Sequence, residues 1–216
     1  MFEAMGFAVG IATLAIAGLV LRSTLGTGSE EVATAFRVSD RTTIAALQPN
    51  VLARVVGKAK PLGKTVSAPL SGRECVYYAV IVYEWVHSGK SGYWQVVYTA
   101  CDHAPFAVID ATGQVGVDPT GAEVALRHGF MQPWPWRRFT PQMLALMAAN
   151  NDRGSGRRFR EAIIGVGETI ALAGSATATT APAGEPYRGS SEQLTFTSND
   201  VFRLAISNRP HFVRQR

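Results

Sequence analysis

Cysteine is nearly absent from this sequence, which has only Cys75 and Cys101 among its 216 residues. Two thiols form at most one bridge, and a structural zinc site takes four ligands that are mostly cysteine and histidine. No Cys-x-x-Cys pair occurs in the sequence. These shortages exclude a disulfide-stapled scaffold, and also a zinc finger or RING built from these residues alone.

Charged residues are also scarce, at 17% of the chain, whereas 47% of the residues are hydrophobic. A disordered chain has the opposite balance, so we expect a globular protein. The length suits one compact domain with an appendage. The net charge of +5 suits nucleic acid and anionic lipid equally well, so composition alone does not identify a partner.

The common catalytic patterns are missing or incomplete. Gly89-Lys90-Ser91 is part of a phosphate-binding loop pattern, but Glu84 stands where the earlier glycine of that loop belongs. Cys101 and His103 would share one face of a strand, yet a buried cysteine and a turn histidine explain the pair without catalysis. The histidines and cysteines also lack the short spacings of a metal site. We therefore expect no catalytic residue, no cofactor and no metal.

A long apolar run is present at the N-terminus. Ala4–Leu21 contains no charged residue, and a helix of 18 residues is about 27 Å long, close to the ~30 Å of a hydrocarbon core. A cleaved signal peptide carries positive residues before such a run, whereas Glu3 stands there. The sequence therefore predicts a transmembrane anchor in residues 1–24, followed by a juxtamembrane linker in residues 25–40.

The residues around the apolar run predict how it lies in the membrane. Arg22, Arg37 and Arg41 follow the run, and positive residues stay on the cytoplasmic side, so we expect a single-pass protein with its soluble part in the cytoplasm. Gly6 and Gly10 form a Gly-x-x-x-Gly spacing that permits close packing of two helices. These two glycines are the candidate helix-helix contact of a homodimer.

Residues 41–210 have the patterns of one domain that is mostly strand. Val, Ile, Tyr and Trp dominate several segments, which fits a pleated surface. The predicted strands cover residues 51–59, 74–87, 93–101, 106–109, 115–117, 159–164, 169–176 and 193–197, and short helices are expected at 41–48, 142–149 and 198–207. Strands and helices do not alternate as in a doubly wound parallel sheet. We expect an α+β fold that is mainly β, barrel-like or a sandwich, with two or three short helices.

Two side-chain patterns within this domain have predicted local or surface roles. Asp110 and Asp118 stand at turns, where aspartate bonds its own backbone. The cluster of Trp134, Trp136, Arg137 and Arg138 places two aromatic rings beside two cations, which suits a membrane interface or a protein-binding patch. The tryptophans could equally cap the end of a barrel. This cluster is the candidate interaction surface.

Four short runs carry a resemblance to a known family: Ala68–Tyr78, Phe106–Pro119, Glu161–Gly174 and Leu194–Ser198. In their order and spacing they resemble the GIDE domain, also called BAM for "beside a membrane". That domain is known from mitochondrial membrane-anchored RING ubiquitin ligases and from bacterial membrane proteins. The resemblance implies a domain next to a bilayer and an association with ubiquitin transfer. The ligases add a second membrane helix and a RING, and neither pattern occurs in these 216 residues.

The sequence leaves three functions open. The first is a membrane-anchored, non-enzymatic binding or scaffolding domain, whose partners are the lipid bilayer and other membrane proteins. The alternative is a RING-less member of the E3 ubiquitin-protein ligase (GIDE) family, in which a partner performs ubiquitin transfer. The third is weak binding of anionic lipid or nucleic acid, and nucleic acid is the least expected partner because charge alone suggests it.

Overall fold

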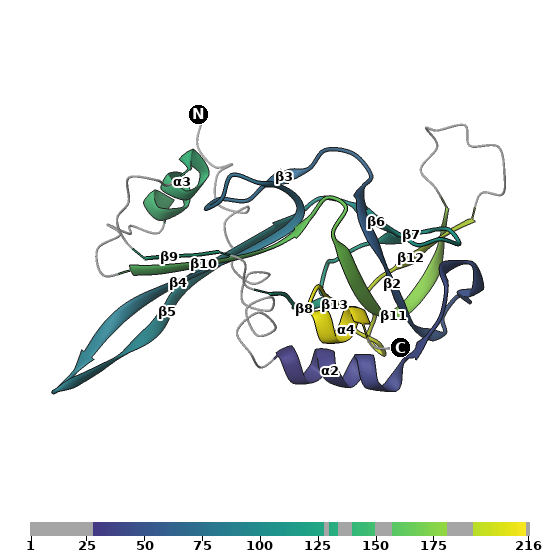
Figure 1. Cartoon of the computed structure of the whole chain (residues 1–216), viewed down its shortest axis with the longest axis horizontal. Coiled ribbons are helices and arrows are strands. Elements are labelled where there is room, and N and C mark those ends of the chain that lie inside the picture. Colours follow the sequence, from purple (N-terminus) through teal and green to yellow (C-terminus); the bar gives the residue numbers. More distant parts are fainter. Residues whose placement is uncertain (1–27, 128–129, 134–139, 150–156, 181–191, 215–216) are drawn as a thin grey trace, which may run out of the picture.

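The computed structural model describes residues 28–127, 130–133, 140–149, 157–180 and 192–214, and strands make up most of them (Figure 1). The strands are β1 (Asp40–Arg41), β2 (Leu52–Pro61), β3 (Val66–Ser67), β4 (Glu74–Ser88), β5 (Ser91–His103), β6 (Phe106–Ile109), β7 (Gln114–Val117), β8 (Glu123–Ala125), β9 (Phe130–Pro133), β10 (Arg157–Gly165), β11 (Thr169–Thr180), β12 (Glu192–Phe196) and β13 (Ala205–Ser207). The helices are α2 (Gly28–Val38), α3 (Pro141–Ala149) and α4 (Pro210–Arg214), with a 3-10 turn η1 (Ile44–Ala46). The predicted mainly β fold with a few short helices is confirmed.

Five strands close into a mixed barrel, on the right of Figure 1. Their order around the ring is β2, β6, β7, β12 and β11, and β11 returns to pair with β2. The β12–β7 pair is parallel and the other four pairs are antiparallel. The short strands β13 and β8 continue the sheet from β11, and β1 pairs with β2. The barrel alternative, rather than the sandwich, is therefore the observed one.

A second sheet lies beside the barrel and contains the longest hairpin. β10 stands between β9 and β4, and the other edge of β4 pairs with β5 and β3. The hairpin of β4 and β5 projects from this sheet as an arm, at the lower left of Figure 1. Helix α3 packs on the sheet through a cluster that contains Met143, Met147, Val80, Val82 and Phe159.

The two sheets share one hydrophobic core. β10 leads into β11 through a short turn in which Gly167 has a positive φ of 76°. Side chains from the base of the second sheet, among them Val76, Tyr77 and Ile164, belong to the same buried cluster as the barrel residues. The barrel interior is therefore closed on this side by apolar side chains, so it is a packed core and not a channel.

A buried carboxylate fixes the loop that joins β3 to β4. Glu161 of β10 is 2% exposed, and its Oε1 accepts a hydrogen bond from the backbone N–H of Leu70 at 2.6 Å. The N–H of Ser71 donates to both oxygens of the same carboxylate, at 3.4 and 3.3 Å. Because a buried carboxylate needs such donors, this contact ties two of the four runs that carry the family resemblance to each other.

Helix α3 begins where the sequence predicts a helix start. The Thr140 hydroxyl accepts a hydrogen bond from the N–H of Met143 at 3.2 Å, which is an N-cap contact, and Pro141 is the first helical residue. The same hydroxyl donates to the carbonyl of Pro69. Thr140 therefore both starts the helix and attaches it to the loop that Glu161 holds.

Helix α2 is the main element that the sequence did not predict. It lies in the segment expected to be a linker, and it packs on the outside of the barrel together with α4 (Figure 1). Val32 and Phe36 are four residues apart and buried, and they contact Phe212 of α4 and Ala205 of β13 within one cluster. The segment was predicted as a linker because the residues before Glu30 are rich in Gly, Ser and Thr, and the amphipathic pattern that follows them is short.

Two predicted helices are wrong in extent or place. The segment 198–207 is not a helix, because residues 205–207 form β13 and Ser198 accepts a hydrogen bond from the N–H of Leu204 instead of capping a helix. Asn199 accepts two backbone N–H groups of the same loop and so closes a turn there. In the segment 41–48, Arg41 belongs to β1 and the helical part is the single 3-10 turn η1.

The predicted membrane anchor lies outside the described residues, as do Gly6 and Gly10. Within the part of the chain that the structure describes, no helix combines the length and the apolar character that crossing a bilayer requires. The anchor, the helix-helix contact and the domain boundaries at residues 24, 40 and 210 therefore stay predictions.

Asp110 ties the η1 turn to the β6–β7 hairpin. Its Oδ2 accepts the N–H of Ile44 at 2.9 Å, and its Oδ1 accepts the Thr112 hydroxyl at 2.6 Å and the N–H groups of Thr112 and Gly113 at 2.6 and 3.0 Å. Asp118 accepts one N–H, from Thr120. The local turn role predicted for both aspartates is confirmed, and Asp110 has an additional long-range role.

These contacts set the charge state of Asp110. Burial alone would raise the pKa of its carboxyl, but the hydrogen bonds from Thr112, Ile44 and Gly113 outweigh burial and lower the pKa below its ordinary value of 3.8. A lowered pKa in the folded state means that the carboxylate stabilises the fold above pH 3.8, and that this contribution is lost as the pH falls toward the folded-state value.

We expect Asp110→Asn to lower the free energy of unfolding at pH 7 by roughly 1–3 kcal/mol, because an amide offers one acceptor oxygen to four donors. The difference in free energy of unfolding between the variant and the unaltered chain should become smaller below pH 4. Denaturant titration of the full chain in detergent, from pH 7 downward, measures both effects. Asp118→Asn is the matched control, with a loss below about 1 kcal/mol because only one bond is involved. If this difference in free energy did not change with pH, the ionised carboxylate of Asp110 would not be the source of the stabilisation.

Candidate functional site

The interaction surface predicted from Trp134, Trp136, Arg137 and Arg138 lies outside the described residues. The structure therefore does not test whether these side chains form a patch.

Neither cysteine has the environment of a reactive nucleophile. Burial is the main cause that raises the pKa of the Cys75 thiol to about 11, and the nearby Glu161 carboxylate adds to it. Burial, followed by the charge of Asp102, also raises the pKa of Cys101. A thiol with a raised pKa carries little thiolate at neutral pH, and thiolate is the reactive form. β5 extends two residues beyond the predicted strand and includes His103 as well as Cys101, but this placement does not activate the thiol.

The two thiols are free and stand too far apart for a disulfide. Cys101 pairs with Ala79, which is four residues along β4 from Cys75. At ~3.3 Å per residue this separates them by about 13 Å, whereas bridged Cα atoms lie within about 7 Å. Across the described residues, no three His, Cys, Asp or Glu side chains gather as a metal site would require.

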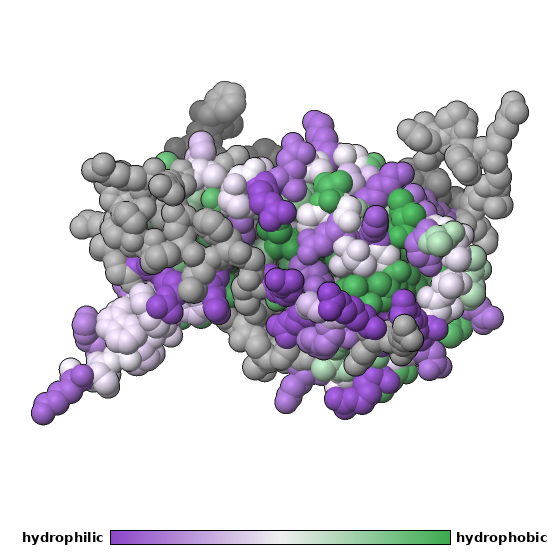
Figure 2. Space-filling view, in the orientation of Figure 1, coloured by the Kyte–Doolittle hydropathy of each residue, from purple (hydrophilic) through white to green (hydrophobic). Residues whose placement is uncertain are grey.

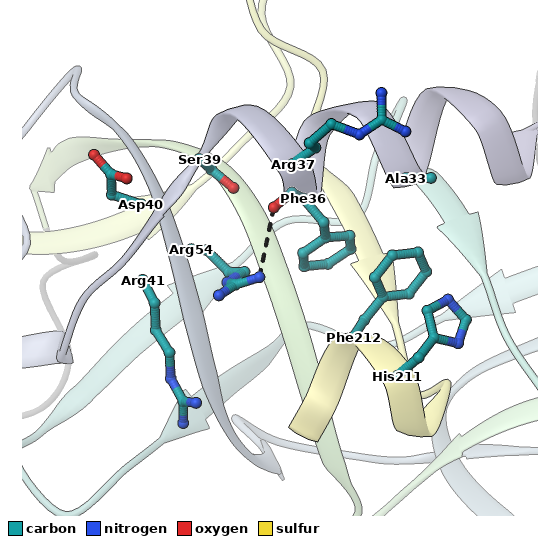
Figure 3. A pocket seen from close by; sticks show the side chains of 9 residues that line it. All are labelled: Ala33, Phe36, Arg37, Ser39, Asp40, Arg41, Arg54, His211 and Phe212. Atoms are coloured by element: carbon teal, nitrogen blue, oxygen red, sulfur yellow. Dashed lines mark hydrogen bonds between the residues drawn. The ribbon is translucent and has the colours of Figure 1, made fainter. Parts of the chain in front are cut away.

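An open cavity of about 700 Å³ lies where α2, β1, β2 and α4 meet (Figure 3). The residues that line it are Ala33, Phe36, Arg37, Ser39, Asp40, Arg41, Arg54, His211 and Phe212. The volume is in the usual range for small-ligand sites. The lining includes three arginines and one aspartate, so its net charge favours an anionic group.

Arg54 is the central polar residue of the cavity. It lies on β2, is 7% exposed, and its Nη1 donates to the carbonyl of Phe36 at 3.5 Å. That carbonyl belongs to the last turn of α2, where helix carbonyls lack helical partners. Arg54 therefore holds the end of the helix over the cavity, and Figure 3 shows its guanidinium between the helix and the side chain of Arg41.

Two further side chains complete the polar part of the cavity. Arg41 pairs with Arg54 across the parallel β1–β2 ladder, so two arginines stand side by side on neighbouring strands. Ser39 is 6% exposed, and its buried Oγ has no hydrogen-bond partner among the described residues. Because an unpaired buried hydroxyl is costly, it is suited to receive a ligand oxygen.

The opposite wall of the cavity is aromatic. The rings of Phe36 and Phe212 stack with centroids 4.6 Å apart, and the His211 ring lies 3.9 Å from that of Phe212 (Figure 3). The cavity thus combines a cationic side with an apolar side. Such an arrangement can hold an anionic group that carries an apolar part, but it contains no activated nucleophile.

The cavity has only a weak signal in the sequence. Arg54 is a charged residue inside the apolar strand 51–59, which is unusual for a strand that packs on both faces. The rest of the lining comes from α2, which was not predicted, and from α4, which begins 156 residues after Arg54. No local pattern joins these segments.

Comparison with known proteins places the chain in a family. The family model described as "GIDE: E3 Ubiquitin ligase" matches residues 84–197, which is more than half of the chain and runs from the end of β4 through β12. No curated protein and no solved structure matches. The resemblance seen in the sequence is therefore confirmed, and this chain belongs to the GIDE family.

Proposed function

We propose that the chain is a membrane-anchored binding or scaffolding domain that holds a partner beside the bilayer and performs no reaction itself. The observation that supports this most is the cavity under α2, which offers three arginines, a buried hydroxyl and an aromatic wall. Its groups recognise and hold a ligand. The two thiols, the nucleophiles that the sequence singled out, lie elsewhere and are largely buried.

The proposed mechanism is confinement. An anchor at residues 1–24 keeps the domain at the cytoplasmic face, where it meets membrane proteins at a raised effective concentration. The group bound in the cavity is an anionic one, a carboxylate or a phosphate, on such a partner, because arginine recognises both through paired N–H donors. Close packing at Gly6 and Gly10 would add a second copy of the chain.

The anchor is tested by placing a charge at the middle of the apolar run. We expect Ala12→Arg to move the chain into the soluble fraction, because a central arginine costs about 2.5–3.5 kcal/mol on insertion. Alkaline extraction followed by vesicle flotation measures the distribution of the full chain. Ala12→Leu is the matched control and should stay with the membrane. An unaltered chain that remains soluble would remove the anchor from the proposal.

The cavity is tested at Arg41, which lies at its exposed rim and is not part of the hydrophobic core. We expect Arg41→Gln to reduce cross-linking to membrane proteins by roughly tenfold, because the loss of one charge-assisted hydrogen bond weakens binding by about that factor. Quantitative mass spectrometry of adducts from detergent extracts provides the measurement. Lys58→Gln removes an exposed charge from β2 outside the cavity and should leave the adducts unchanged. Equal adducts with Arg41→Gln would show that the cavity does not hold the partner.

A second candidate function is part of ubiquitin transfer, and the family description favours it. The two cysteines of the 216 residues are too few for the zinc ligands of a RING, so this chain would need a partner that recruits the conjugating enzyme.

We expect the purified full chain to bind no stoichiometric zinc and to transfer no ubiquitin when it is mixed with activating and conjugating enzymes alone. Elemental analysis and a conjugation assay measure these two properties. Transfer by the purified chain would replace the first proposal. Transfer that appears only after membrane extract is added, and that Arg41→Gln abolishes, would join the two functions at the cavity.

A further inference from the structure

The arm formed by β4 and β5 extends beyond the rest of its sheet. β10 begins at Arg157, which pairs with Glu84, so from Trp85 to Ser88 the strand β4 has β5 as its one described neighbour. Figures 1 and 2 show this end of the hairpin projecting away from the body of the molecule. An isolated two-stranded hairpin is marginally stable in water, so a protruding one needs an explanation.

The projecting end is rich in exposed aromatic residues. Trp85 is 37% exposed and Tyr93 is 55% exposed. Trp85 and Trp94 are cross-strand partners whose rings meet edge to face, 5.3 Å apart. A side chain at Gly92 would meet the Trp85 ring at 2.6 Å, so glycine lets that ring lie directly on the β5 backbone. The aromatic pair thus stiffens the hairpin while leaving ring surface open.

The projecting part of the arm carries one formal charge, which is positive. Residues 85–101 contain no Asp or Glu, and Lys90 stands at the tip. At the root, Glu84 is paired with Arg157 at 3.4 Å, and the guanidinium of Arg158 lies 4.1 Å above the Trp94 ring. Figure 2 shows a hydrophilic tip followed by residues of intermediate hydropathy. Tryptophan and tyrosine next to lysine and arginine is the composition that favours the headgroup zone of a bilayer.

The position of the arm suits contact with the same bilayer that would hold the anchor. The predicted membrane run ends at Leu21 and α2 begins at Gly28, so at most about 25 Å of extended chain separates them. In Figure 1 the tip of the arm and α2 both lie along the lower edge of the view, so one plane can touch both. A contact at the tip of the arm, in addition to the anchor, would restrict the rotation of the tethered domain relative to the membrane surface.

Another occupant, a strand added to the edge of β5 that has no partner among the described strands, fits less well. The ladder between β4 and β5 shifts register between Val82 and Tyr83, because Val97 is an extra residue on β5. A bulge of this kind twists an edge strand and interrupts the regular donors and acceptors that strand addition needs.

We propose that the tip of the β4–β5 arm is a membrane-contacting element, which places Trp85 and Tyr93 in the headgroup zone and Lys90 near lipid phosphates. This inference rests on the proposed anchor at residues 1–24. It gives the domain two attachment points, so that the cavity under α2 keeps a fixed orientation to the bilayer.

The test uses fluorescence of the full chain in phosphatidylcholine vesicles. Trp134→Phe and Trp136→Phe leave Trp85 and Trp94 as the emitting residues. In vesicles whose acyl chains carry bromine close to the headgroups, we expect a loss of this emission relative to unlabelled vesicles. Lys90→Glu, at an exposed position, should reduce the loss when the vesicles also contain anionic lipid.

The matched control moves the reporter to the body of the domain. Phe202 is 36% exposed, nearly the same as Trp85 at 37%. A chain with all four tryptophans changed to Phe and with Phe202→Trp should emit equally in both kinds of vesicle. Equal loss at both reporters would mean that the whole domain lies on lipid, which overturns a specific role for the arm.

Flotation of the same samples separates this inference from the proposed anchor. A chain that floats with the vesicles while Trp85 and Trp94 keep their full emission overturns the arm contact and leaves the anchor standing. A chain that stays in the aqueous fraction overturns both.

Discussion

The pairing of β2 with β11 is the interaction on which the rest of the structure depends. It closes the barrel along seven residue pairs, from Thr169 opposite Lys58 to Ser175 opposite Leu52. The opposite edge of β11 pairs with β13 and β12, so this strand holds three neighbours. β11 also continues from β10, which carries the second sheet and its arm. If this strand were displaced, the core and both proposed sites would lose their support.

The closed ladder also determines where a polar cavity can form. Side chains alternate along β2, so Val55 points into the barrel core while Arg54 and Val56 point outward. An outward arginine is normally exposed, but α2 covers this face and buries it. The Phe36 carbonyl at the helix end meets the guanidinium and offsets part of the cost of burying a charge. Helix and strand thus make a cationic cavity that neither would make alone.

The sequence predicted what depends on local patterns and missed what depends on distant contacts. Dense Val, Ile, Tyr and Trp identified β4, the apolar run that stops at Asp110 identified β6, and the Thr140–Pro141 pair identified the start of α3. The helix expected after Ser198 failed because Leu204, Ala205 and Ile206 are buried in the core, and tertiary packing overrides a local capping signal. The cavity could not be predicted, because its walls come from residues 33–54 and 211–212, which only the closed barrel brings together.

Binding and ubiquitin transfer make different demands on a domain, and the described residues meet the first more closely. Transfer through a thiol needs an exposed cysteine with a lowered pKa, whereas burial raises the pKa of Cys75 and Cys101. Binding needs a stable surface with groups that lack partners of their own, and Ser39 offers such a group beside Arg54. Membership of a family described by its ligases is compatible with this, since a ligase must hold a target as well as modify it. A domain that only holds a partner can rely on a barrel and a tether, because a fixed orientation and a raised local concentration compensate for a weak intrinsic affinity.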